Sequence, residues 1–173
     1  MEVEPASGRL LSSHSSSLRV QLAAAVVLGV LFGIGAAFLE MHVTPRLETA
    51  LGILAVFVGV TVAHEGLHGL VGLAVGHRPE FGFRPSFVFT TFRERVPRGR
   101  FLALILAPLI LLDAAAFAML ASGIWPVFSY MAAVMNTIGS IEDVRMAWIL
   151  LRAPRGSMVQ DTKTGFEVWS REP

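Results

Sequence analysis

The residues of this chain best suited to catalysis or metal binding lie in one short segment, His64-Glu65-Gly66-Leu67-His68. Residues four apart on an α-helix share a face about one turn apart, so both imidazoles can reach one metal ion. Glu65 stands beside them, where its carboxylate can polarise a water molecule and act as a general base. The segment therefore predicts a Zn²⁺ site that activates water for hydrolysis.

A purely structural role is the alternative for these polar residues. The segment lies inside an apolar run, where burying a glutamate and two histidines in lipid costs several kcal/mol unless they are paired. Such residues can also hold helices together through polar contacts. Metal binding is the better account, because histidine and glutamate are rare in membrane spans and the pattern is unexpected there by chance.

A third metal ligand must come from elsewhere, because a catalytic zinc site has three protein ligands and one open position. The chain has no cysteine, which excludes thiolate ligands and disulfides. The candidates within apolar runs are Asp113, Glu142 and Asp143. Depth along the helices permits both Asp113 and Asp143. The segment 136–143 favours Asp143, since it places an amide, small residues and two acids in an otherwise apolar run.

The other polar groups in these runs have two interpretations each. Asn136 lies two helical turns before Asp143 and shares its face. As a catalytic candidate it could orient substrate or stabilise an oxyanion, or it could form an interhelical hydrogen bond, and the sequence favours neither. Glu142 points away from Asp143 and could pair with Arg145 or with an interfacial Arg. Asp113 could hold a histidine tautomer or remain an isolated protonated acid.

Four apolar runs must position these groups. Hydrophobic residues make up 54% of the 173 residues and charged residues only 16%, against roughly 25% charged in typical globular chains. About 20 helical residues, at roughly 1.5 Å each, cross a hydrocarbon core of about 30 Å. We therefore predict an all-α polytopic membrane protein with four transmembrane helices and the metal motif on the second. The runs are 20–39, 50–75, 101–120 and 127–151.

Two polar segments show strand patterns. Residues 80–92 are aromatic and β-branched in partial alternation with polar residues, which predicts an extended β-like segment in the long connection. Residues 158–169 predict a short C-terminal hairpin around a turn at 161–165.

The distribution of Lys and Arg predicts the topology. Basic residues precede the first run, fill the connection between the second and third, and follow the fourth, whereas Arg46 stands alone on the other side. The positive-inside rule then places both termini in the cytoplasm of a multi-pass cell-membrane protein. We expect a flexible tail at 1–17, a four-span domain at 18–151 and a cytoplasmic tail at 152–173. A net charge of +1 gives no case for nucleic-acid binding.

The order of these motifs resembles DUF3267, a family of small zincin membrane peptidases. Four features carry the resemblance: Ala-His-Glu-Gly-Leu-His-Gly in the second run, an aromatic-basic segment ending Arg-Gly-Arg-Phe before Ala107-Pro108, the segment 136–143, and the tail Pro-Arg-Gly-Ser-Met-Val-Gln-Asp-Thr-Lys-Thr-Gly-Phe-Glu-Val from residue 154. The resemblance covers most of the chain after about residue 50, and it implies a metal-dependent peptidase.

More distantly, the arrangement is similar to the site-2 protease class, which carries HExxH on one span and an Asp ligand in an Asn-containing motif on a later span. That similarity implies that His64, His68 and Asp143 bind Zn²⁺ and that Glu65 is the base. It also implies that segment 80–92 lines the substrate path by strand addition. The chain departs from the class by lacking its Pro after the Asn and its Leu-Asp-Gly at the acid, which leaves the third ligand less defined than the histidines.

The expected function is hydrolysis of a polypeptide substrate in or near the lipid bilayer. The metal activates water and stabilises the oxyanion, and Glu65 takes the proton. A helical substrate has to unwind first, because its backbone is fully hydrogen-bonded in lipid. The alternatives are a non-catalytic metal-binding membrane protein, such as a sensor or scaffold, and a small metal carrier. Four spans without an inverted repeat argue against a carrier.

Overall fold

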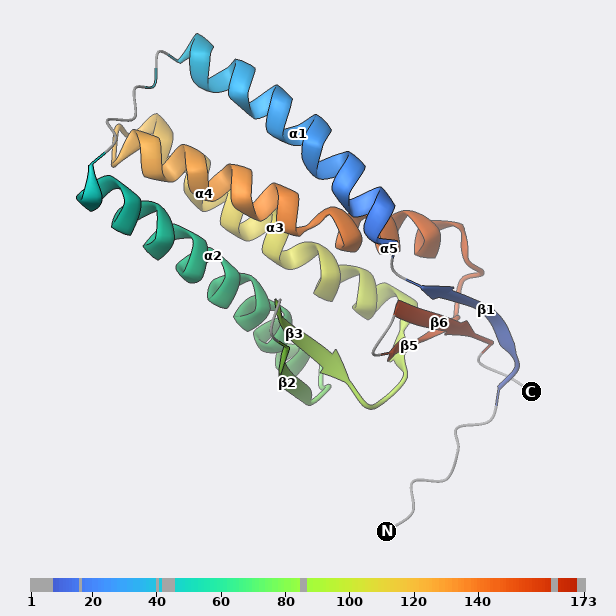
Figure 1. Ribbon diagram of the computed structural model, residues 1–173. Helices are drawn as coiled ribbons and strands as arrows, with labels where there is room; N and C mark the ends of the chain where they lie inside the picture. The colour runs from blue at the N-terminus through green and yellow to red at the C-terminus, as the bar shows by residue number, and fades with distance from the viewer. Residues whose placement is uncertain are drawn as a thin grey trace.

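The structure, a computed structural model, describes residues 8–15, 17–39, 41, 46–84, 87–162 and 165–170. Its helices are α1 (Leu18–Phe38), α2 (Leu47–Ala74), α3 (Arg98–Ala121), α4 (Pro126–Gly139) and α5 (Ile141–Arg152). Its strands are β1 (Leu10–Ser15), β2 (Pro79–Arg84), β3 (Phe87–Phe92), β4 (Val96–Pro97), β5 (Met158–Thr162) and β6 (Gly165–Trp169). The helices form a bundle, and the strands lie together where α2 ends and α3 begins (Figure 1).

Helices α1, α2 and α3 are each long and apolar enough to cross a membrane. The apolar window of α1 contains no buried residue, and that of α2 is only 6% buried. Water would penalise so much exposed apolar surface, whereas a lipid hydrocarbon core does not. The described chain is therefore mostly helical, with three membrane-length helices and small sheets, and this indicates a membrane protein.

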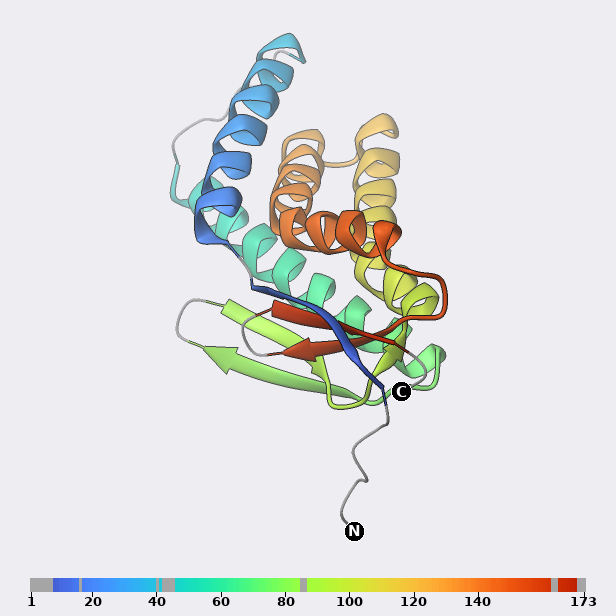
Figure 2. The same cartoon turned by 90° about the vertical axis from the view of Figure 1, so that its right-hand side faces the viewer.

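The fourth apolar run does not form the continuous helix expected over 127–151. The chain leaves helical geometry at Ser140, where ψ is 4°, and α4 and α5 meet there. Ser140 is fully buried, and its hydroxyl donates to the carbonyl of Asn136, a local bond by which serine competes with helical geometry. Figure 2 shows α5 turning sharply away from the axis of α4. At 14 residues, α4 alone is shorter than the roughly 20 residues that a membrane span requires.

The strands form two antiparallel sheets. One has the order β1-β6-β5-β4, and the other is the hairpin of β2 and β3. The prediction of extended structure at 80–92 is confirmed as this hairpin, and the hairpin predicted at 158–169 is confirmed as β5 and β6. Within the tail expected at 1–17, Leu10–Ser15 forms β1, which pairs with the edge of β6.

A small hydrophobic core joins the four-stranded sheet to the bundle. Its members are buried residues of β3 to β6, of α3 and of α5. The most enclosed of them are Val96, Leu150, Val159, Phe166 and Val168. This core fixes α3 and α5 relative to the sheet, and α5 is the helix that carries Asp143.

Close backbone approaches fix α2 against the hairpin and α3. A Cβ added at Gly69 would lie 2.4 Å from the ring of Phe81, and one added at Gly72 would lie 2.4 Å from the ring of Phe92. Only glycine leaves room for these rings. The metal motif of α2 is thereby held beside the hairpin.

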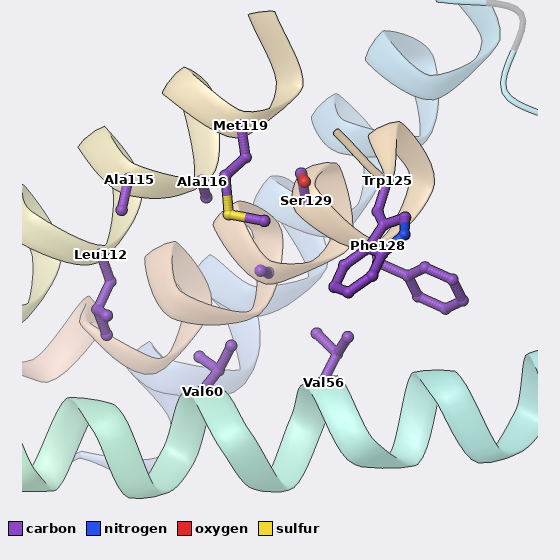
Figure 3. A pocket seen from close by; sticks show the side chains of 10 residues that line it. Val56, Val60, Leu112, Ala115, Ala116, Met119, Trp125, Phe128 and Ser129 are labelled. Atoms are coloured by element: carbon purple, nitrogen blue, oxygen red, sulfur yellow. The ribbon is translucent and has the colours of Figure 1, made fainter. Parts of the chain in front are cut away.

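An apolar cavity of about 230 Å³ lies between α2, α3 and α4 (Figure 3). Val60, one helical turn before His64, is the lining residue of α2 nearest to the metal motif in the sequence, so the cavity lies on the side of the motif toward the start of α2. Ser129 is a polar member of the lining, and its hydroxyl already donates to the carbonyl of Ile124. The cavity therefore offers apolar volume and no reactive group.

Candidate metal centre

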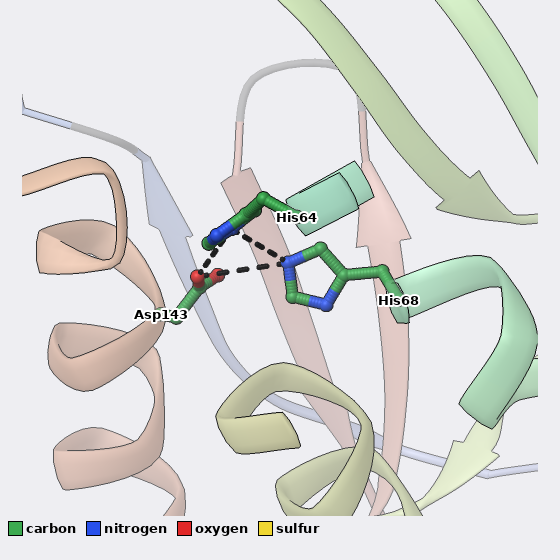
Figure 4. A group of neighbouring side chains, drawn as sticks. All are labelled: His64, His68 and Asp143. Carbon is green, nitrogen blue, oxygen red and sulfur yellow. Dashed lines mark hydrogen bonds and ion pairs between the residues drawn. The ribbon is translucent and has the colours of Figure 1, made fainter. Parts of the chain in front are cut away.

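Three side chains from two helices converge on one point. The Nε2 atoms of His64 and His68 lie 3.1 Å apart. Asp143 Oδ2 lies 3.2 Å from the first and 3.6 Å from the second. Figure 4 shows both imidazoles of α2 directed at the carboxylate of α5. All three residues are buried, with at most 9% of each exposed.

The size of this triangle fits a zinc ion. Edges of 3.1, 3.2 and 3.6 Å place each ligand atom about 1.9 Å from the triangle's centre, close to the roughly 2.0–2.2 Å of Zn–N and Zn–O bonds. The three residues would supply three ligands, and a catalytic zinc site keeps its fourth position for water or substrate. Two histidines and one carboxylate are also a donor set that zinc uses in hydrolytic sites.

The hydrogen-bonding state of the three atoms points to a cation as well. Both histidines use Nδ1 to reach oxygen atoms of the protein, so in the neutral rings Nε2 carries a lone pair and no proton. Among the described residues, the buried atom Asp143 Oδ2 has no hydrogen-bond partner. Three acceptors facing one another repel unless a cation lies between them, so the residues present fit a metal ion.

Asn136 and Asp113 hold the ring of His64. Nδ1 of His64 donates to Asn136 Oδ1 over 3.0 Å. The amide nitrogen of Asn136 donates to the carbonyl of Pro108 over 3.1 Å and to Asp113 over 2.8 Å. Both of its partners only accept, which fixes the orientation of the amide. Thr137 donates to the other carboxylate oxygen of Asp113 over 2.8 Å, so a chain of bonds runs from α3 through α4 to α2.

His68 is held by the backbone of α3. Its Nδ1 donates to the carbonyl of Leu104 over 3.0 Å, and the bond is buried. Metal-binding histidines usually have such a partner on the second ring nitrogen, because it fixes the tautomer and the direction of the first. Each histidine of the motif therefore has its own support, from α4 for His64 and from α3 for His68.

Two features position the carboxylate of Asp143: the break in the helix at Ser140, and the contacts that hold α5 against α1 and β1. Asp143 stands in the first turn of α5. Its neighbour Glu142 forms an ion pair with Arg145 and accepts a hydrogen bond from Gln21 of α1. Arg145 also donates to the carbonyl of Ser15 at the end of β1. α1 and β1 thus stabilise the helix that supplies the third candidate ligand.

Glu65 occupies a half-buried position beside the hairpin. Its backbone carbonyl accepts a hydrogen bond from the hydroxyl of Thr90 in β3, over 3.0 Å. On the helix, Glu65 directly follows His64, so its side chain projects about 100° around the axis from the ligand face. The hairpin is therefore fixed next to the acid that the sequence assigns as base.

The structure separates the three acids that the sequence offered as third ligand. Asp143 joins the two histidines. Asp113 bonds to Asn136, which agrees with the interpretation that it supports a histidine, and Glu142 pairs with Arg145 as expected. Asn136 has both ends of its amide engaged and is 1% exposed. This geometry favours the interhelical hydrogen bond over the orientation of substrate or an oxyanion.

Sequence reasoning missed two contributors near the centre. The carbonyl of Leu104 is a backbone atom, so residue type alone could not reveal it. Asp161 of β5 was interpreted only as a turn residue. Its burial raises the pKa of its carboxyl to about 6, a hydrogen bond from Thr91 partly offsets this, and the charges of His68 and Asp143 also act on it. The four-stranded sheet thus brings a further acid within electrostatic reach of His68 and Asp143.

Helical HExxH with an acid from a later helix, inside a chain with membrane-length helices, defines a membrane protein with a zincin-type candidate centre. The family model DUF3267, described as "Putative zincin peptidase", matches residues 56–158, and the chain belongs to this family. The match includes all three candidate ligands and Glu65. No curated protein and no solved structure matches the chain.

Proposed function

We propose that this protein is an intramembrane zinc peptidase that hydrolyses a polypeptide in or near the bilayer. The observation that carries the proposal is the convergence of His64, His68 and Asp143 around an unpartnered buried carboxylate oxygen, with Glu65 adjacent on the same helix. Membership of a zincin family supports peptide hydrolysis as the reaction.

The chain's own residues divide the chemistry between them. His64, His68 and Asp143 would hold Zn²⁺, which when bound supplies Lewis-acid activation of water and of a carbonyl oxygen. Glu65 would accept the proton of the attacking water and deliver it to the leaving amide nitrogen, so that one amine and one carboxyl group are formed. Asn136 would orient His64 rather than contact substrate, because its amide is already engaged.

The topology that we propose has both termini in the cytoplasm. The start of α3 and the end of α5 lie at the sheet end of the bundle (Figure 1), and they carry the basic residues Arg98, Arg100 and Arg152, which supports this orientation. The pair α4 and α5 would complete a fourth crossing with a bend at Ser140. The metal centre, at the level of this bend, would then lie in the cytoplasmic half of the membrane.

A substrate segment would reach the centre beside the β2–β3 hairpin. The bond from Thr90 to the Glu65 carbonyl fixes β3 next to the motif. An extended polypeptide adding to this hairpin would have its backbone carbonyls exposed for attack, unlike a helix in lipid.

The decisive experiment compares wild type with Glu65→Gln, an almost isosteric change. Each is expressed in cells, and the newly formed N-termini of membrane polypeptides are determined by mass spectrometry, while bound zinc is measured on the purified proteins. We expect equal zinc content and a loss of specific new N-termini in Glu65→Gln, because only the base is removed. Equal zinc with identical N-termini in both would refute proteolysis and leave the sensor, scaffold or carrier alternatives.

A further inference from the structure

A proline stands in the middle of α3 and is fully buried there. In an α-helix each backbone N–H donates to the carbonyl four residues earlier. Pro108 has no N–H, so the carbonyl of Leu104 cannot receive that bond. Proline is also the least favourable residue for a helix interior, and in a membrane helix it is tolerated where neighbouring groups satisfy the freed carbonyl.

The freed carbonyl has a partner on another helix. Leu104 is only 2% exposed, and a carbonyl this deep needs a donor from the protein. The donor is Nδ1 of His68, at 3.0 Å. In a regular helix, the N–H of residue 108 would compete for this oxygen.

The carbonyl of Pro108 itself serves the other histidine. It accepts a bond from the amide of Asn136 over 3.1 Å, and Asn136 in turn accepts from Nδ1 of His64. One turn of α3, from Leu104 to Pro108, therefore presents two backbone oxygens that fix the rings of both histidines.

We propose that Pro108 is a positioning residue of the metal centre: by lacking an N–H, it leaves the Leu104 carbonyl free to hold His68 as the Nδ1–H tautomer, with the Nε2 lone pair directed at the metal position. This inference rests on the metal binding in the proposed function. It assigns a purpose to a residue that would otherwise only weaken α3.

The test substitutes Pro108→Ala, which restores the missing N–H and removes two buried methylene groups of the ring. Pro126→Ala is the matched control, because Pro126 occupies the first turn of α4, where the missing N–H leaves no helical carbonyl unpaired. Zinc Kd is measured on detergent-purified protein by competition with a chromogenic chelator, and Tm is measured on the metal-free protein. A ¹⁵N-histidine NMR spectrum of the metal-free protein reports the tautomer of His68.

We expect Pro108→Ala to weaken zinc binding by about tenfold or more, the range typical of lost support to a metal-bound histidine. Its metal-free Tm should equal or exceed that of wild type, because alanine favours a helix more than proline does. The Nδ1–H tautomer of His68 should dominate in wild type and be depleted in Pro108→Ala. Pro126→Ala should bind zinc within twofold of wild type.

Three results would overturn the proposal. A zinc Kd within twofold of wild type in Pro108→Ala would show that His68 does not depend on the freed carbonyl. A variant that fails to fold or melts lower would show that Pro108 serves the stability of α3 instead. Wild type without bound zinc would remove the proposed function itself, and it is distinguished from the other two because it requires no variant.

Discussion

The support of His64 by Asn136 yields the most detailed prediction. Replacing Asn136 by alanine removes the acceptor of the His64 Nδ1 proton and the donor to Asp113. The backbone positions of α4 stay the same, because alanine is the best helix former. The variant therefore tests the hydrogen bonds of the Asn136 side chain and leaves the stability of the helix itself largely unchanged.

The expected magnitude follows from the groups left without partners. The imidazole N–H and one carboxylate oxygen lose bonds of 3.0 and 2.8 Å in a region where Asn136 is 1% exposed. A buried polar group without a partner costs about 1–3 kcal/mol, so the loss of partners for these two groups should lower the free energy of unfolding by about 2–6 kcal/mol. Zinc affinity should fall by roughly 10–100-fold, as is typical when the second nitrogen of a metal-bound histidine loses its partner.

Thr137→Val is the matched control for this substitution. Thr137 donates to the same acid, Asp113, over the same 2.8 Å, and valine keeps its shape. Chelator competition should give a zinc Kd within twofold of wild type, and thermal melts in detergent should show a loss of about 1 kcal/mol. If Asn136→Ala bound zinc as tightly as Thr137→Val, the reasoning that Asn136 positions His64 would be refuted.

Two further predictions concern the sheets. Burial raises the pKa of Asp161 to about 6 from 3.8, so the folded state keeps this proton where the unfolded chain has lost it. The free energy of unfolding of the metal-free protein should therefore fall by up to about 3 kcal/mol as pH rises from about 4 to about 6. Asp161→Asn should remove that slope from melts across this range, and an unchanged slope would contradict the assignment. Gly72→Ala should lower the free energy of unfolding by about 1–2 kcal/mol, because the added Cβ meets the ring of Phe92 at 2.4 Å. Gly59→Ala, with nothing within 4 Å, should stabilise α2 slightly, and equal melts for the two glycine variants would refute this packing.

The sequence predicted what depends on local pattern. Apolar runs of about 20 residues correspond to three of the helices, because a membrane span imposes length and composition directly. The spacing of His64 and His68 placed both on one face of a helix. Asp143 could be proposed as their partner because an acid in an apolar run is costly and needs a use.

Features that depend on contacts between distant parts of the chain could not be predicted from these local patterns. β1 is a serine-rich strand that pairs with β6, 150 or more residues away in the sequence, so its own composition gives no strand signal. The break at Ser140 depends on one backbone angle within a run that is apolar on average. In the sequence, only Pro108 indicates that the carbonyl of Leu104 lacks its helical hydrogen bond. Which group bonds to that carbonyl instead depends on which helix lies opposite, and the sequence does not show this.

The most direct test of this account is the zinc content of the purified wild type compared with His68→Ala, Asp143→Ala and His77→Ala. His77 is the control, since it is a buried histidine that pairs with Glu94 outside the three-residue group. We predict one zinc per chain in wild type and His77→Ala, and loss of tight binding in His68→Ala and Asp143→Ala. Wild type without zinc, or His68→Ala with its zinc retained, would contradict the centre proposed here.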